Sequence, residues 1–396
     1  MQKQIEVRAT YMRGGSSKGV FFETTDLPAD PARRDALLMR VIGSPDPYGK
    51  QTDGMGAATS STSKVVLVSR STRADCDVDY LFGQVDIEQP RIDWTGNCGN
   101  LTTAVGPFAI ARGLVEAPAD GVAVVRIWQA NIGKVIVAHV PMAGGTVQEL
   151  GDFVLDGVAF PAAQVRLDFL APGGDGSSAG ESLLPTGNVV DVLSVEGVGR
   201  FDVTYINAGN PTIFLRASDL GLTGRELQPD VNGDAALLAR IEAVRAAGAV
   251  AMGLAASAAQ ATASRPGTPK LAWVAPPADY VASSGKAVPA QALDLLVRIV
   301  SMGKLHHAIT GTGAVAVGAA AAVEGSIVAQ ALRPGVAAGQ DVRMGHTSGA
   351  LAVGATAEHR PESGWVIAKV SLSRSARRLM EGVVLVPPVD EALARG

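Results

Sequence analysis

The chain has 396 residues, of which 47% are hydrophobic and 18% charged, and its formal net charge is −4. This length indicates two or three domains and is enough to bury a large core, while the low charged fraction excludes a disordered chain. Two cysteines exclude a disulfide scaffold and a four-cysteine metal site, and the acidic balance argues against a nucleic-acid partner.

In the first half of the chain, the glycine-rich segment 13–19 predicts a turn between two strands. A helix is expected after it, with Asp30 as N-cap, Pro31 at the first position and Gly43 just past the end. A second helix, rich in small residues, is predicted from residue 99 to about 114. Strands are expected at 4–10, 19–23, 64–68, 79–87, 122–128 and 134–140.

The segment 171–188 is rich in Gly, Ser and Pro and predicts a long loop or a domain boundary. We therefore expect an N-terminal lobe of residues 1–187 and a C-terminal lobe of residues 188–396. Helices are predicted at 234–247, at 289–302 and after Thr310. Strands are predicted within 189–206 and near 326–332, 350–356, 364–371 and 382–386.

Secretion is not expected, because the first residues of the sequence lack an apolar run of signal-peptide length. The most apolar stretch, 314–332, is mostly Ala, Val and Gly and contains Glu324. We expect it to form a buried helix rather than a membrane span. A cytoplasmic protein with reduced thiols and no membrane partner is the resulting interpretation.

A weak internal repeat favours two similar halves. CGNLTTAVG from Cys98 and TGTGAVAVG from Thr310 agree at four of nine positions. Each segment is a glycine turn that opens a small-residue helix, and such a helix lets strands approach closely. The repeat predicts two similar α+β lobes, each a sheet wrapped around a helix, with a cleft between them.

Two residues are candidates for proton transfer. Cys98 stands at a predicted helix N-terminus, where the helix dipole favours a thiolate and backbone N–H groups can bind a carboxylate. Lys64 enters a buried strand, and desolvation is expected to lower its pKa so that it can act as a general base. The alternatives are a small buried cysteine and a strand-end lysine that reaches solvent. Cys76, among three carboxylates, is expected to be inert.

The glycine-rich turn resembles a phosphate loop only superficially, because Ser17 precedes Lys18 and Gly19 follows it. A backbone nest for a carboxylate, assisted by Ser16, Ser17 and Lys18, is the better interpretation. Asn210 lies in an Asn–Pro turn that either is structural or orients a carboxylate. The five histidines lack metal-binding spacing and no strand precedes a G-x-G-x-x-G motif, so no metal or other cofactor is expected.

Five motifs stand in order between residues 9 and 349. They are ATYMRGGSSKG from Ala9, GSPDPY from Gly43, TSSTSK from Thr59, WTGNCGN from Trp94 and MGHTSG from Met344. Together they resemble the 2-methylaconitate cis–trans isomerase family of the methylcitrate cycle, which usually has Thr in place of Ser16. The resemblance implies a diaminopimelate epimerase-like α+β fold with two lobes, each a curved sheet around a central helix, and the active site between them.

The epimerases of that fold use one cysteine at each helix N-terminus, whereas this chain has Thr310 at the second. The resemblance therefore implies catalysis by Lys64 and Cys98 in a cofactor-independent isomerase, which acts on 2-methylaconitate in propionate degradation by removing and returning an allylic proton. Whether Cys98 is an acid–base group or a positioning donor stays open. The implied substrate-binding residues are Ser16, Ser17, Lys18, Asn97, Gly99, Asn100, Asn210, Thr310, Gly311 and Thr312.

A related isomerase of oxalomesaconate, methylitaconate or aconitate is the alternative function, and a non-catalytic carboxylate-binding protein is the less favoured one. Both take a small-molecule di- or tricarboxylate as partner. An exposed edge strand on either lobe leaves room for a homodimer, although no residue pattern indicates one.

Overall fold

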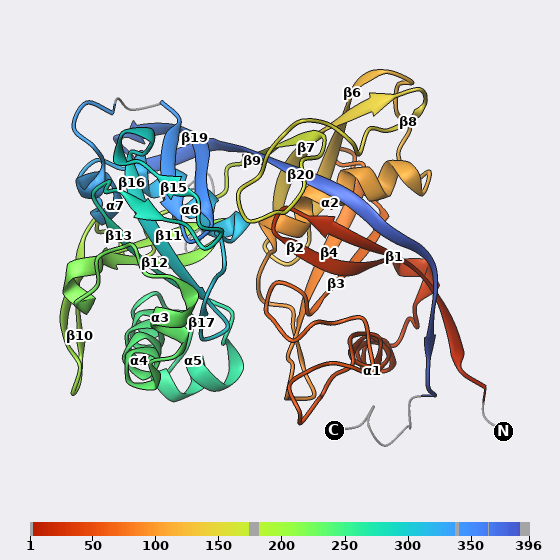
Figure 1. Ribbon diagram of the computed structural model, residues 1–396, viewed down its shortest axis with the longest axis horizontal. Helices are drawn as coiled ribbons and strands as arrows, with labels where there is room; N and C mark the ends of the chain where they lie inside the picture. The colour runs from red at the N-terminus through yellow and green to blue at the C-terminus, as the bar shows by residue number, and fades with distance from the viewer. Residues whose placement is uncertain (1–2, 174–181, 337–339, 363, 389–396) are drawn as a thin grey trace. The chain divides into compact units, whose positions relative to one another are not determined.

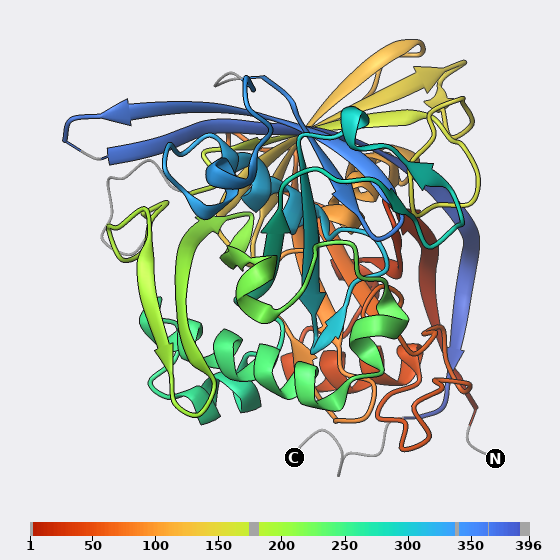
Figure 2. The same ribbon diagram turned by 60° about the vertical axis from the view of Figure 1, so that its left-hand side comes forward.

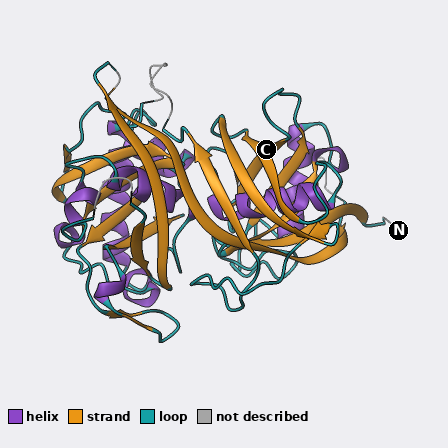
Figure 3. Cartoon of the chain, turned by 90° about the horizontal axis from the view of Figure 1, so that it is seen from above, coloured by secondary structure: helices purple, strands orange, loops and turns teal. Residues whose placement is uncertain are grey.

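The computed structural model of the chain describes residues 3–173, 182–336, 340–362 and 364–388 (Figure 1). The chain forms two compact units. Unit 1 comprises residues 1–154, 160–167 and 374–396, and unit 2 comprises residues 155–159 and 168–373. Within each unit, strands enclose helices, which are drawn in purple in Figure 3.

This division differs from the single boundary expected at residue 187. The reason is the last strand, β20 (Gly364–Val386), whose C-terminal half pairs antiparallel with β1 (Ile5–Gly14) at the beginning of the chain. The described residues from 374 to 388 therefore belong to unit 1. In the predicted loop 171–188, residues 174–181 lie outside the described residues.

Unit 1 is built on a sheet in which β1 and β2 are antiparallel, β2 and β3 parallel, β3 and β4 antiparallel, β4 and β6 parallel, and β6 and β7 antiparallel. Helices make the parallel crossovers. The elements after β1 are β2 (Ser17–Glu23), a 3₁₀ turn (Thr24–Asp26), α1 (Pro31–Ile42), β3 (Lys64–Arg70), β4 (Val78–Val85), β5 (Ile92–Asp93), α2 (Gly99–Ala111), β6 (Gly121–Gln129), β7 (Lys134–Ala143), β8 (Thr146–Val147) and β9 (Gln164–Leu170), whose last residues belong to unit 2.

The first helix of unit 1 begins and ends as its sequence predicts. The side chain of Asp30 accepts a hydrogen bond from the backbone N–H of Arg33 at 2.9 Å, and Pro31 occupies the first helical position. Gly43 ends the helix in the left-handed region, with φ of 84°. The second helix, α2, is buried along nearly its whole length and contains Pro107.

Unit 2 repeats the strand pattern of unit 1. Its pairs β11–β12, β12–β13, β13–β16, β16–β18 and β18–β19 are antiparallel, parallel, antiparallel, parallel and antiparallel in turn. The predicted internal repeat is therefore present in the architecture. The strands are β10 (Asp191–Val195), β11 (Gly199–Ala208), β12 (Asn210–Arg216), β13 (Lys270–Ala275), β14 (Tyr280–Val281), β15 (Ala287–Val288), β16 (Leu295–Ser301), β17 (Lys304–Leu305), β18 (Val342–His346) and β19 (Gly349–Arg360).

Helices lie on both faces of the unit 2 sheet. The α4 helix covers the face that carries Tyr205, Ile213 and Trp273, and α4 and α5 are among the green helices in the lower part of Figure 2. On the opposite face, α6 approaches so closely that a Cβ on Gly313 would lie 2.4 Å from the Ile299 side chain. The helices are α3 (Gln228–Asn232), α4 (Ala235–Ala251), α5 (Ala258–Ser264), α6 (Gly311–Ala321) and α7 (Ile327–Ala331), with 3₁₀ turns at Ala217–Leu220 and Ala290–Ala292.

Two of the elements predicted in unit 2 have the wrong secondary structure. The expected helix at 289–302 is a 3₁₀ turn followed by β16, whose residues are all buried, so no alternation marks them as a strand. The expected strand at 326–332 is α7, which Ser326 caps through a hydrogen bond from the backbone N–H of Ala329 at 2.9 Å. The strands expected at 364–371 and 382–386 are both present, as parts of the single strand β20.

The apolar stretch 314–332 is not one helix. The α6 helix ends at Ala321, and Gly325, with φ of 80°, separates it from α7. Among the described residues, no helix is long and apolar enough to cross a membrane.

Candidate active site

Most of the expected site residues of unit 1 lie on the sheet face that packs against α2. The ring of Phe21 on β2 lies 5.5 Å from that of Phe108 on α2. Because side chains alternate along a strand, Ser17 shares this face. Lys18 points to the opposite face, where its Nζ lies 5.2 Å from the ring centroid of Tyr11. Lys18 is therefore the one expected site residue of unit 1 that does not join the others.

Lys64 begins β3 on the face turned toward α2, and only 6% of its surface is exposed. Its Nζ donates a hydrogen bond to Oε1 of Gln84 at 2.7 Å and lies 5.0 Å from the ring centroid of Phe82. The amide nitrogen of Gln84 donates to the backbone carbonyl of Ser63 at 2.9 Å. That second bond fixes the amide so that its oxygen faces the lysine.

Cys98 is the N-cap of α2, directly before Gly99. Its Sγ accepts a hydrogen bond from the backbone N–H of Leu101 at 3.5 Å, which satisfies one of the unpaired donors of the first turn. The hydroxyl of Tyr80 donates to the Cys98 carbonyl at 3.3 Å. The Cys98 side chain is also hydrogen-bonded to Lys64. The two residues expected to be catalytic are thus in direct contact.

Burial is the main influence on the titration of these groups. It lowers the pKa of Lys64 below its ordinary value, although the charge and the hydrogen bond of Cys98 act in the opposite direction. Burial also raises the pKa of Tyr80 well above its usual value, so this phenol stays neutral. At the other cysteine, burial and then the charge of Asp75 raise the pKa of Cys76, which agrees with its expected inertness.

The turn between β1 and β2 lies against the first turn of α2. Asn100 donates a side-chain hydrogen bond to Oγ of Ser16 at 3.0 Å. Gly15 has φ of 52°, and a Cβ there would lie 2.6 Å from the Asn100 side chain, so only glycine fits. Asn97 is also buried at this helix end, and its side-chain oxygen accepts a hydrogen bond from Thr102 at 3.4 Å. Four of the expected anion-binding residues, Ser16, Asn97, Gly99 and Asn100, are therefore together at the α2 N-terminus.

In unit 2, the N-terminus of α6 is capped in the same way as the N-terminus of α2 in unit 1. Thr310 caps α6, and its Oγ1 accepts a hydrogen bond from the backbone N–H of Gly313 at 3.0 Å. Asn210 follows the tight β11–β12 turn and donates to Oγ1 of Thr312 at 3.2 Å, much as Asn100 donates to Ser16 in unit 1. The expected residues Asn210, Thr310, Gly311 and Thr312 are thus close to one another.

Residues 4–387 match the family described as PrpF protein. The chain belongs to the PrpF family. It is 60% identical to the 2-methyl-aconitate isomerase of Shewanella oneidensis, over 97% of this chain and 98% of the relative. It is 59% identical to the 2-methyl-aconitate isomerase of Cupriavidus necator, with the same coverage. The expectation of an isomerase is confirmed.

Solved structures confirm the diaminopimelate epimerase-like α+β fold. The PrpF-family chain is similar to methylitaconate-delta-isomerase, with a TM-score of 0.75 and 38% identity over 100% of this chain and 98% of the other. It also resembles a probable proline racemase from Agrobacterium radiobacter, with a TM-score of 0.54 and 13% identity over 98% and 95% of the two chains. The second likeness is one of fold alone.

Lys270 and Arg374 are among the buried cations that sequence reasoning missed. Lys270 begins β13 in unit 2 as Lys64 begins β3, and its Nζ donates to Oγ of Ser301 at 3.1 Å. Each lysine precedes an apolar run, of four residues after Lys64 and five after Lys270. A comparison of the two repeats could have revealed this shared pattern. Arg374, on β20 in unit 1, is completely buried. No motif surrounds it in the sequence.

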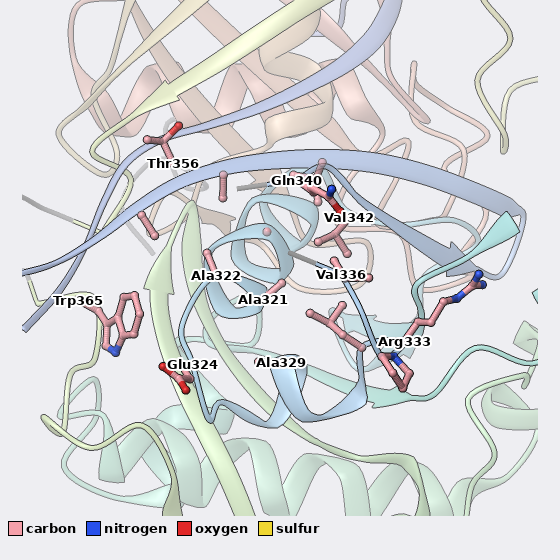
Figure 4. A pocket seen from close by; sticks show the side chains of 16 residues that line it. Ala321, Ala322, Glu324, Ala329, Arg333, Val336, Gln340, Val342, Thr356 and Trp365 are labelled. Atoms are coloured by element: carbon pink, nitrogen blue, oxygen red, sulfur yellow. The ribbon is translucent and has the colours of Figure 1, made fainter. Parts of the chain in front are cut away.

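A cavity of about 720 Å³ in unit 2 is separate from these residues (Figure 4). It lies at the C-terminal end of α6 and is lined by Ala321, Glu324, Arg333 and Trp365 among others. Thr310 is at the other end of α6, about 16 Å away along the helix. None of the expected site residues of this PrpF-family chain lines the cavity.

Proposed function

We propose that this protein isomerises unsaturated tricarboxylates and that its preferred substrate is 2-methylaconitate. The observation that carries the proposal is the contact between buried Lys64 and Cys98 at the N-terminus of α2. The relatives named for 2-methyl-aconitate support this choice of substrate. The proposed activity needs one base of lowered pKa beside an anion-binding helix end, and both features occur together in unit 1.

Lys64 acts as a neutral amine in the proposed reaction. One N–H of the amine donates to Oε1 of Gln84, and Cys98 is its second hydrogen-bond partner, so a neutral Lys64 keeps one lone pair to accept the substrate proton. The lone pair takes an allylic proton from the carbon next to a carboxylate. The C–H electrons form a dienolate, in which the original double bond is weakened and can rotate. The Lys64 ammonium then returns the proton to carbon.

Charge that develops on the dienolate is stabilised at the helix end. The backbone N–H groups of the first turn of α2 and the positive end of its dipole favour a carboxylate or dienolate there. The Ser16–Asn100 pair adds polar groups on the adjacent turn. A single preorganised donor of this kind typically contributes about 10²–10³-fold to the rate, and a positioned base about 10²–10⁴-fold.

A second candidate is the migration of a double bond in methylitaconate. It is favoured by the 38% identity to methylitaconate-delta-isomerase. The same base would remove the proton, and only the carbon that is reprotonated would differ. The two reactions therefore share one site and differ in the shape of the pocket around the methyl group.

A substrate panel tests the proposed function. Purified protein is incubated in D₂O with 2-methylaconitate, methylitaconate, oxalomesaconate and trans-aconitate, and ¹H NMR follows both isomerisation and deuterium incorporation. We expect the highest kcat/KM for 2-methylaconitate, with deuterium entering the allylic position. A higher value for methylitaconate would support the second candidate. Absence of exchange in every acid would favour a carboxylate-binding protein without catalysis.

Replacement of Cys98 by serine is expected to shift the pH profile of the reaction. The charge and the hydrogen bond of Cys98 raise the pKa of Lys64, so loss of the charge lowers that pKa further. A larger fraction of Lys64 is then neutral at a given pH, and the acidic limb of kcat/KM moves to lower pH. The profile is measured from the residual deuterium exchange of the Cys98→Ser variant. A limb that stays in place or moves to higher pH would contradict the assignment of this limb to Lys64.

A further inference from the structure

Arg374 is a buried cation that has no hydrogen-bond acceptor among the residues that the structure describes. Its side chain is fully buried, and within the described ranges none of its three guanidinium nitrogens has a hydrogen-bond acceptor. Burial lowers the pKa of Arg374 to about 10, which still leaves the group charged at neutral pH. A buried charge without a partner is strongly unfavourable, because the lost hydration is not replaced. An anion that enters this position would remove that cost.

The strand register places Arg374 beside the N-terminus of α2. On the β1–β20 ladder, Gly14 is opposite Ala376, and opposed residues share one face of the sheet. A Cβ on Gly14 would lie 2.9 Å from Cα of Leu101, so this face is the one turned toward α2. Arg374 is two residues from Ala376 and therefore points to the same side. The charge of Cys98, the N-cap of α2, acts on Arg374 from there.

We propose that Arg374 binds a carboxylate of the substrate. The inference rests on the proposed function only for the identity of the anion. A guanidinium presents parallel N–H groups that match the two oxygens of a carboxylate. Lys64 cannot serve this purpose while it acts as the base, because it must then be neutral. Arg374 supplies a positive charge that does not depend on the protonation state of the base.

A different role would be to hold Cys98 as a thiolate. The geometry favours the carboxylate, because Sγ of Cys98 is not an acceptor for any of the Arg374 nitrogens. The Cys98 sulfur instead accepts from the backbone of Leu101 and interacts with Lys64. The hydrogen-bonding capacity of Arg374 is therefore left for a ligand.

Binding of the saturated tricarboxylate tricarballylate tests this inference without turnover. Isothermal titration calorimetry compares the full-length wild type with Arg374→Met, Arg374→Lys and the matched control Arg378→Met, which removes an arginine of the same strand that contacts Glu149. We expect Arg374→Met to weaken binding by about 10- to 100-fold, as for the loss of a charge-assisted hydrogen bond, and Arg374→Lys to recover part of it. Arg378→Met should bind like the wild type.

A second measurement uses the wild type, in case Arg374→Met does not fold. The Arg374 Nε–H signal, identified by its absence from the Arg374→Lys spectrum, should shift in ¹⁵N NMR as tricarballylate is added. Unchanged affinity in a folded Arg374→Met variant, an unmoved signal, or a change confined to the rate of Cys98 alkylation by iodoacetamide would each overturn the inference. If Arg374→Met weakens binding but the wild type isomerises no tricarboxylate, the proposed function fails and the carboxylate site stands.

Discussion

Replacement of Lys64 by methionine is expected to lower kcat by about 10²–10⁴-fold, the contribution of a positioned general base. Methionine fills a similar volume and removes the amine, so the buried sheet face keeps its packing while Gln84 and Cys98 lose their shared partner. Deuterium wash-in to 2-methylaconitate and trans-aconitate, followed by ¹H NMR, should fall in parallel with kcat. Parallel loss is required because both processes begin with removal of the same proton.

Two further variants separate loss of the base from loss of charge. Lys64→Arg keeps a cation, but a guanidinium is protonated at any workable pH and cannot accept the proton, so it should be as impaired as Lys64→Met. Lys134→Met removes a lysine at the start of β7 in the same unit and should retain wild-type exchange. Wash-in at the wild-type rate in folded Lys64→Met would show that another group is the base.

The cap of α2 could be predicted from the sequence because its determinants are local. The motif around Cys98 specifies the glycine turn, the helix start and the small residues that let strands approach. The burial of Lys64 could likewise be predicted, because it precedes an unbroken apolar strand. The pairing of Cys98 with Lys64 could also be predicted, but only from the resemblance of the motifs to a known family.

Arg374 could not be found in this way, because its role depends on a register between the two ends of the chain. Nothing near Arg374 distinguishes it from the arginines that follow it at 377 and 378. Only the pairing of β20 with β1 assigns it to the face of α2. The position of Lys18 also depends on the strand that carries it. Because side chains alternate along β2, Lys18 points away from α2 and toward Tyr11, although it lies within the motif.

The errors in unit 2 have a common physical cause. The β16 strand is buried on both faces, so its apolar run has no period and is compatible with a helix or a strand. The α7 helix contains Ile327 and Val328, which favour strands, yet the cap by Ser326 and burial of its apolar residues stabilise a helix. In both places tertiary packing overrides local propensity.

Replacement of Gly14 by alanine is expected to damage both stability and activity. A Cβ there would lie 2.6 Å from the backbone oxygen of Asn100 and 2.9 Å from Cα of Leu101, and neither backbone atom can move without shifting α2. Overpacking of this kind typically costs about 1–3 kcal/mol in the free energy of unfolding. A displacement of about 1 Å between base and substrate can further reduce kcat by about 10²-fold.

The pairing of β1 with β20 also provides a control for Gly14→Ala. Gly382 on β20 is opposite Ala9 on β1, and a Cβ on Gly382 would meet no atom within 4 Å. Gly382→Ala should therefore change the free energy of unfolding by less than about 0.5 kcal/mol, as is usual for open surface positions, and leave kcat unchanged. Urea denaturation and steady-state kinetics of both variants measure the two effects. Equal behaviour of the two variants would contradict the requirement for glycine at the contact of β1 with α2. A loss of stability and of kcat in Gly14→Ala but not in Gly382→Ala would show that activity depends on the distance between β1 and the end of α2 that carries Cys98.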